Sequence, residues 1–120
     1  MKIEKVEVRE IASRFGTPVY VYSLEILRRA IQEIKKLSPV TRYAMKANSN
    51  IHILKEMLNN QVKIDAVSVF EVQRALRAGF RTDDICFTSD VFFNDDDVKF
   101  CLENNIYCNC GTLGMVEEYG

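Results

Sequence analysis

The sequence has no excess of positive charge, no long apolar run and no leader-like N-terminus, and each absence excludes a class of protein. Sixteen Lys and Arg stand against 17 Asp and Glu, for a net charge of −1, whereas nucleic-acid binders carry a basic excess. No apolar stretch approaches the roughly 18 residues that a membrane helix needs. Residues 1–5, MKIEK, are charged and include an acid, unlike a signal or transit peptide. We therefore expect a cytoplasmic protein that binds neither nucleic acid nor membrane.

Metal ligands are also scarce. His52 is the only histidine, and the four cysteines lie in the last third of the chain, unlike a disulfide framework spread over a secreted scaffold. Cys108 and Cys110 have no second pair at zinc-finger spacing. Residues two apart on a strand share a face, so we expect the cysteines to fill core positions. The sequence predicts no metal site.

What is present is a repeating alternation of two patterns, within a length that suits one domain. Four β-type runs begin 21 to 23 residues apart, and helical patterns separate them. The runs are Thr41–Lys46, Ile64–Val69, Ile85–Ser89 and Ile106–Cys110. This spacing is that of βα units, and it predicts an α/β fold with a parallel sheet.

Two further elements precede the first βα unit. Leu24, Leu27, Ile31 and Ile34 form one apolar stripe, which predicts a helix with Ser23 as its N-cap. Before it, residues 19–22, VYVY, follow a Gly-Thr-Pro turn and read as a strand.

Lys46 ends the first of the four runs, and parallel sheets place their chemistry at the carboxyl ends of strands. Strand alternation puts Arg42, Ala44 and Lys46 on one face. A lysine at a desolvated site can form a Schiff base with an aldehyde cofactor. The alternative is a lysine that extends from a strand end into solvent.

The chain resembles the N-terminal part of the pyridoxal-phosphate-dependent amino-acid decarboxylases with an alanine-racemase-like barrel. This family includes the diaminopimelate, ornithine and arginine decarboxylases. The resemblance is carried by the opening GTPVYVY at 16–22, YAMKAN at 43–48, the run from Ile53 to Met57, QVKID at 61–65, and DAVS at 65–68 with Glu71. Ala75-Leu76 and Ala78-Gly79 complete the match. The segment from residue 49 to residue 65 is most similar to the bacterial diaminopimelate decarboxylases.

The resemblance implies a fold, a reaction and a site. The fold is a parallel (β/α) barrel of which residues 23–120 form about the first half, and residues 1–22 are an N-terminal segment that joins the family's β-domain. The cofactor is pyridoxal 5′-phosphate, bound covalently by Lys46 as the catalytic residue, with Asp65 and Ala44 in the same cofactor pocket. The reaction is decarboxylation of meso-diaminopimelate to L-lysine, in a homodimer.

Several residues have other interpretations. Asp65 would otherwise pair with a nearby cation, Lys63 or Arg42. Ser68 and Glu71 form a capping-box pattern that explains both without a catalytic role. His52 would lie on the surface of the helix that follows Lys46.

Three residues depart from the family pattern. Gln61 occupies a position where relatives place a glycine with left-handed backbone. Asn60, one residue earlier, is the alternative position for that conformation. Phe70 places a large side chain, and Ser89 a serine, where relatives often have glycine. These substitutions bear on the geometry around the cofactor.

A complete barrel needs about 250 residues, and no Gly-x-Gly phosphate loop occurs in these 120. We therefore expect a fragment with weak or no activity alone. The alternatives are a non-catalytic cofactor-binding module or remnant, and a decarboxylase of ornithine or arginine. An open-sheet nucleotide-binding domain is disfavoured because no glycine-rich turn follows the first βα strand.

Overall fold

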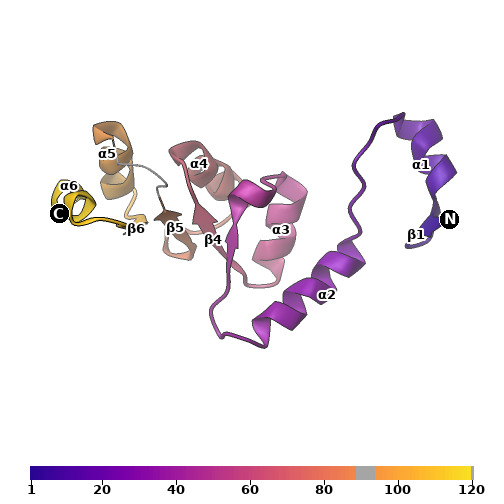
Figure 1. Ribbon diagram of the computed structural model, residues 1–120, viewed down its shortest axis with the longest axis horizontal. Coiled ribbons are helices and arrows are strands. Elements are labelled where there is room, and N and C mark those ends of the chain that lie inside the picture. Colours follow the sequence, from indigo (N-terminus) through magenta and orange to yellow (C-terminus); the bar gives the residue numbers. More distant parts are fainter. Residues whose placement is uncertain (89–93, 120) are drawn as a thin grey trace.

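The computed structural model describes residues 1–88 and 94–119, and a four-stranded parallel sheet lies at its centre (Figure 1). The strands are β3 (Arg42–Ala44), β4 (Lys63–Ala66), β5 (Ile85–Thr88) and β6 (Tyr107–Asn109), in the order β3-β4-β5-β6. Helices α3 (Ile51–Asn59), α4 (Val69–Ala78) and α5 (Asp95–Glu103) connect successive strands, and α6 (Leu113–Tyr119) follows the last. Each strand pairs in parallel with the next one along the chain. A sheet that grows in one direction is typical of a (β/α) barrel, whereas a doubly wound sheet reverses its order. The predicted partial barrel is confirmed.

The core lies between the sheet and its connecting helices. Ile64, Ala66, Ile85 and Phe87 are at most 1% exposed, and they alternate along β4 and β5 with half-exposed residues. Because successive strand side chains point to opposite faces, one face packs on helices and the other stays partly open. The open face is the one that a barrel encloses.

Three helices end with the same hydrogen-bond pattern before the next strand. The bond joins the amide of Val62 to the carbonyl of Met57 (2.9 Å), Phe80 to Ala75 (3.2 Å) and Ile106 to Cys101 (2.9 Å). This six-to-one bond defines the Schellman motif, which places the residue before the amide donor in left-handed conformation. Each helix is thereby stopped at a fixed point and the chain turned into the sheet.

The left-handed positions are occupied by three different residue types. Gln61 has φ 58°, Gly79 has φ 105° and Asn105 has φ 52°. The possibility that Asn60 takes this conformation in place of Gln61 is wrong, since Asn60 has φ −97°. The side-chain amide of Asn60 instead donates to the carbonyl of Glu56 at 2.7 Å.

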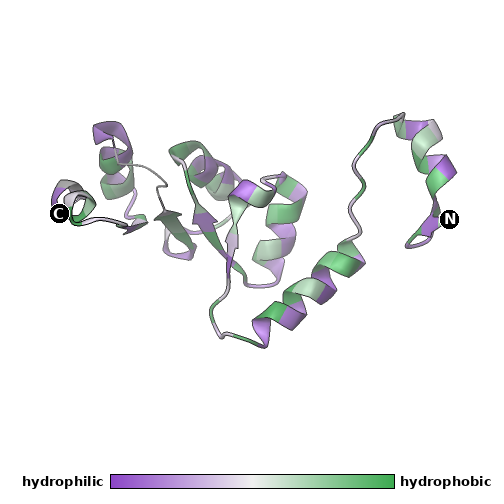
Figure 2. Cartoon of the chain, in the orientation of Figure 1, coloured by the Kyte–Doolittle hydropathy of each residue, from purple (hydrophilic) through white to green (hydrophobic). Residues whose placement is uncertain are grey.

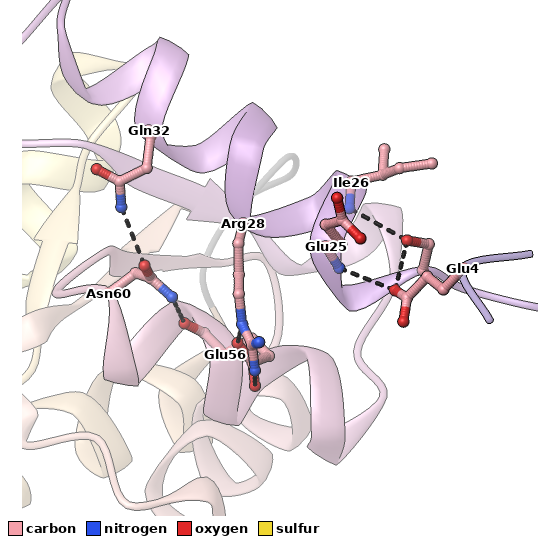
Figure 3. Close-up of polar contacts among 8 residues, drawn as sticks. Glu4, Glu25, Ile26, Arg28, Gln32, Glu56 and Asn60 are labelled. Carbon is pink, nitrogen blue, oxygen red and sulfur yellow. Dashed lines mark hydrogen bonds and ion pairs between the residues drawn. The ribbon is translucent and has the colours of Figure 1, made fainter.

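The predicted helix over residues 24–34 is confirmed as α2 (Leu24–Lys35), and the Ser23 hydroxyl accepts a hydrogen bond from the Ile26 amide at 3.1 Å. Apolar and polar residues alternate along α2 (Figure 2). Its polar side chains attach it to α3 (Figure 3): Arg28 donates two hydrogen bonds, of 2.7 and 2.8 Å, to the Glu56 carboxylate. This bidentate pair holds the pKa of Glu56 below its usual range.

The N-terminal arm, residues 1–22, lies apart from the sheet (Figure 1). It contains β1 (Lys2–Ile3), β2 (Val6–Glu7) and α1 (Val8–Phe15). The radius of gyration, 17.4 Å, exceeds the roughly 14 Å of a compact chain of this length because of this arm. The strand predicted at residues 19–22 is wrong, since these residues are exposed and form no regular structure. A strand needs a hydrogen-bonding neighbour, and the described part of the chain offers none there.

A carboxylate fixes the arm to α2. Glu4 accepts hydrogen bonds from the Ser23 hydroxyl (2.7 Å) and the Glu25 amide (3.0 Å) at the helix N-terminus (Figure 3). No helix among residues 1–88 and 94–119 is long and apolar enough to cross a membrane.

Candidate functional site

Lys46 lies in a 3-10 turn, Met45–Ala47, immediately after β3. The strand predicted to reach Lys46 therefore ends two residues earlier, at Ala44. The reason is local: the Met45 side chain is completely buried, and the hydroxyl of Tyr43 donates to the carbonyl of Asn48 at 3.1 Å, which closes the turn. Lys46 itself is exposed at the carboxyl end of the sheet, where a parallel sheet places its chemistry.

Ala44 and Asp65 lie side by side on the open face. In the sheet register Ala44 is opposite Asp65, and Asp65 is opposite Cys86. Ala44 in this row is two residues before Lys46 along the chain, so the structure brings the three predicted site residues to the carboxyl end of β3 and β4. A small residue, a carboxylate and an amine thus share one edge of the sheet.

The Asp65 carboxylate accepts a hydrogen bond of 2.6 Å from the hydroxyl of Thr88 on β5. The suggested ion pairs with Lys63 or Arg42 are wrong. Lys63 pairs with Asp84 at 3.1 Å, and the Arg42 guanidinium donates to the backbone carbonyls of Ile64 and Asp84.

The contact between Thr88 and Asp65 was not predicted from the sequence, because the register between two strands cannot be read from either strand by itself. The available signal was that Thr88 lies two residues after Cys86, on the same face. Only the pairing of Cys86 with Asp65 turns that spacing into a contact.

Ser68 and Glu71 form the predicted cap at the start of α4. The Ser68 hydroxyl accepts from the Glu71 amide (3.2 Å), and the Glu71 carboxylate accepts from the Val67 amide (2.9 Å). The hydroxyl therefore satisfies an amide of the first helical turn, and the carboxylate satisfies the amide of the residue before the N-cap. Phe70 is 82% exposed and points away from the core.

His52 is exposed on α3, as expected, and its backbone amide donates to the side chain of Asn50, which caps the helix. Ser89, the third departure from the family pattern, lies outside the described residues.

The cysteines are split between core and half-buried positions. Cys101 is completely buried, and burial together with its neighbour Cys108 raises its pKa to about 12. Cys86, Cys108 and Cys110 are half-buried. Within residues 1–88 and 94–119, no three His, Cys, Asp or Glu side chains are grouped closely enough to hold a metal ion.

A cavity of about 470 Å³ lies in the N-terminal arm. All of its lining residues fall between 3 and 22, among them Glu10, Arg14 and Tyr20. The cavity is built by the arm alone and is separate from the edge that carries Lys46.

Three comparisons place this geometry among known proteins. Residues 24–119 match the family described as pyridoxal-dependent decarboxylase, pyridoxal binding domain. The diaminopimelate decarboxylase of Escherichia coli K12 is 41% identical over 114 residues, which are 92% of this chain and 27% of that protein. The chain therefore spans about a quarter of the length of the curated relatives it matches.

Solved structures of diaminopimelate decarboxylases share this fold. A crystal structure of diaminopimelate decarboxylase superimposes with a TM-score of 0.82 at 38% identity, covering 92% of this chain and 27% of that one. The Helicobacter pylori enzyme complexed with L-lysine gives a TM-score of 0.85 at 28% identity, covering 94% of this chain and 30% of that one.

Proposed function

Since the chain belongs to the pyridoxal-dependent decarboxylases, whose pyridoxal-binding domain it matches over residues 24–119, we propose that the complete polypeptide decarboxylates meso-diaminopimelate to L-lysine. The observation that carries this proposal is the placement of Lys46 directly after β3, beside the row formed by Ala44 and Asp65. The 41% identity to the Escherichia coli diaminopimelate decarboxylase supports the choice of substrate over ornithine or arginine.

The residues present suit the aldehyde end of pyridoxal phosphate. Lys46 supplies the primary amine that a Schiff base requires, and it lies where solvent and a ligand reach it. Ala44 leaves space beside it for a planar ring, and Asp65 supplies a negative charge on the same face. When bound, the cofactor delocalises the electrons that remain after the α-carboxylate leaves as carbon dioxide. Groups for the phosphate belong, in this proposal, to the rest of the polypeptide.

Lys46 and Asp65 have separate roles in this proposal. With pyridoxal phosphate bound, the Lys46 amine would hold its aldehyde end and would lie beside the amino group of an incoming substrate. The same amine would lie near the reacting carbon. Asp65 faces the same space from β4 and favours positive charge on a nearby nitrogen.

The domain division belongs to the same proposal. Residues 1–22 form part of a separate β-domain and residues 23–120 the first part of the barrel, in a homodimer when complete. The separation of the arm from the sheet supports the boundary, because Glu4 reaches α2 only at its first turn. Because the chain spans 27% of its relatives, we propose that it has weak or no activity by itself.

The test is carbon dioxide release by the complete polypeptide supplied with pyridoxal phosphate. We expect release from meso-diaminopimelate at a kcat/KM well above those for ornithine and arginine. Lys46→Ala should lower kcat/KM by at least about 10³-fold, and Lys55→Ala, an exposed lysine of α3, should leave it unchanged. Preference for ornithine or arginine would reassign the substrate. Cofactor binding without carbon dioxide release from any of the three would indicate a binding module instead.

A further inference from the structure

We propose that Thr88 is a positioning residue for Asp65, orienting its carboxylate toward the edge of the sheet where the Lys46 amine lies; this rests on the proposed cofactor site. The distance from the Thr88 hydroxyl oxygen to the Asp65 carboxylate oxygen is 2.6 Å. An ionised carboxylate only accepts, so the hydroxyl donates. The length is that of a charge-assisted O–H···O⁻ bond, the stronger class of hydrogen bond.

The register shows which way the bond points. Asp65 is opposite Ala44 on one side and Cys86 on the other. Thr88 lies two residues beyond Cys86, and Lys46 lies two residues beyond Ala44. Thr88, at the end of β5, and Lys46, in the turn that follows β3, therefore lie nearer the carboxyl edge than Asp65. A hydrogen bond to Thr88 draws the carboxylate toward that edge.

A hydroxyl also orients a carboxylate without neutralising it. Two cations on the paired strands β3 and β4 have other partners: Lys63 pairs with Asp84, and Arg42 donates to backbone carbonyls. Thr88 thus restrains Asp65 while its negative charge remains available to a protonated nitrogen at the carboxyl edge. A lysine or arginine in the same place would fix the side chain but cancel its charge.

The alternative is that this bond only ties β4 to β5. The two roles differ in what they change. A tie affects stability and leaves the cofactor unaffected. A positioning residue shifts the protonation of the group that Asp65 faces, and its loss is rescued by any side chain that restores the hydroxyl.

The experiment compares Thr88→Val, which keeps the branched shape and removes the hydroxyl, with Thr88→Ser, which keeps the hydroxyl. The complete polypeptide is loaded with pyridoxal phosphate, and the absorption band of the bound cofactor is followed against pH. Because a well-aimed carboxylate favours the protonated nitrogen, Thr88→Val should lower the midpoint of the spectral transition by about 0.5–1 pH unit. Thr88→Ser should restore the wild-type midpoint. In the cofactor-free protein, the Asp65 side chain should keep one rotamer in Thr88→Ser and populate several in Thr88→Val, as read from NMR couplings.

The outcomes separate the two proposals. If the wild type binds the cofactor at Lys46 and Thr88→Val keeps the wild-type midpoint, the positioning role is wrong and the proposed function stands. If Thr88→Ser shifts the midpoint as much as Thr88→Val, the hydroxyl is not the cause and the role is again wrong. If the wild type forms no adduct at Lys46, the proposed function and this inference both fail.

Discussion

Gln61 adopts a left-handed backbone conformation at the end of α3, and replacing it with glycine should stabilise the protein. Its φ is 58°, in the region where a side chain clashes with its own backbone. For an L-residue this conformation costs about 1–2 kcal/mol. Glycine avoids that cost, but it loses about 0.5–1 kcal/mol in chain entropy on folding. We expect Gln61→Gly to raise the free energy of unfolding by about 0.5–1 kcal/mol.

The other two Schellman helix ends supply matched controls. Asn105 has φ 52°, but asparagine tolerates this region, so Asn105→Gly should change the free energy of unfolding by less than about 0.5 kcal/mol. Gly79 has φ 105°, and a Cβ there would lie 3.2 Å from the Leu58 side chain. Gly79→Ala should therefore destabilise by about 1–2 kcal/mol. Gln61 and Asn105 therefore differ in backbone strain, whereas Gly79→Ala adds a side-chain contact to that strain.

Two assays report the change. Urea unfolding of the complete polypeptide gives the global free energy, and hydrogen exchange at the Val62 amide gives the opening of the helix end, since that amide donates to Met57. Gln61→Gly should slow exchange at Val62, and Gln61→Ala should not, because alanine keeps the strained Cβ. If Gln61→Ala and Gln61→Gly were equally stable, the strain argument would be refuted.

Three other predictions concern single groups elsewhere in the chain. The Ser23 hydroxyl, and next the Glu25 amide, hold the pKa of Glu4 below its usual 4.5. The hydrogen bonds from these two groups to the Glu4 carboxylate therefore stabilise the fold fully above pH 4.5, and this stabilisation is lost as pH falls through the lower pKa of the folded state. An NMR titration of the Glu25 amide should therefore have its midpoint below 4.5, and a midpoint at or above 4.5 would contradict the bond. Cys101 is completely buried with a pKa near 12, so at pH 8.5 iodoacetamide should alkylate it at least about tenfold more slowly than Cys86; equal rates, read by peptide mass spectrometry, would show that this core opens readily. The hydroxyl of Thr41 is buried without a hydrogen-bond partner in the described structure, so Thr41→Val should raise the free energy of unfolding in urea by about 1 kcal/mol, and a loss of stability would show that the hydroxyl is satisfied.

The parts of the fold that depend on local pattern were predictable. The β/α alternation, the Ser23 cap of α2 and the capping residues Ser68 and Glu71 all follow from residue type at fixed spacing, and all are confirmed. These features need only information within a few residues. Local pattern therefore sufficed to place Lys46 at the carboxyl edge of a parallel sheet.

The errors came from features that residue type and alternation alone do not reveal. Residues 19–22 have the composition of a strand, but a strand exists only with a pairing partner. The strand before Lys46 stops at Ala44, where a 3-10 turn begins and the Tyr43 hydroxyl donates to the carbonyl of Asn48, which alternation does not reveal. The hydrogen bond between Asp65 and Thr88 joins β4 to β5, so predicting it requires the register between these two strands.

The central claim is that Lys46 binds pyridoxal phosphate, and covalent trapping tests it most directly. The complete polypeptide is incubated with the cofactor, reduced with borohydride and mapped by peptide mass spectrometry. The account predicts the label on Lys46, its loss in Lys46→Ala and its retention in Lys55→Ala. Label on a different lysine of folded wild-type protein, or undiminished label in Lys46→Ala, would contradict it.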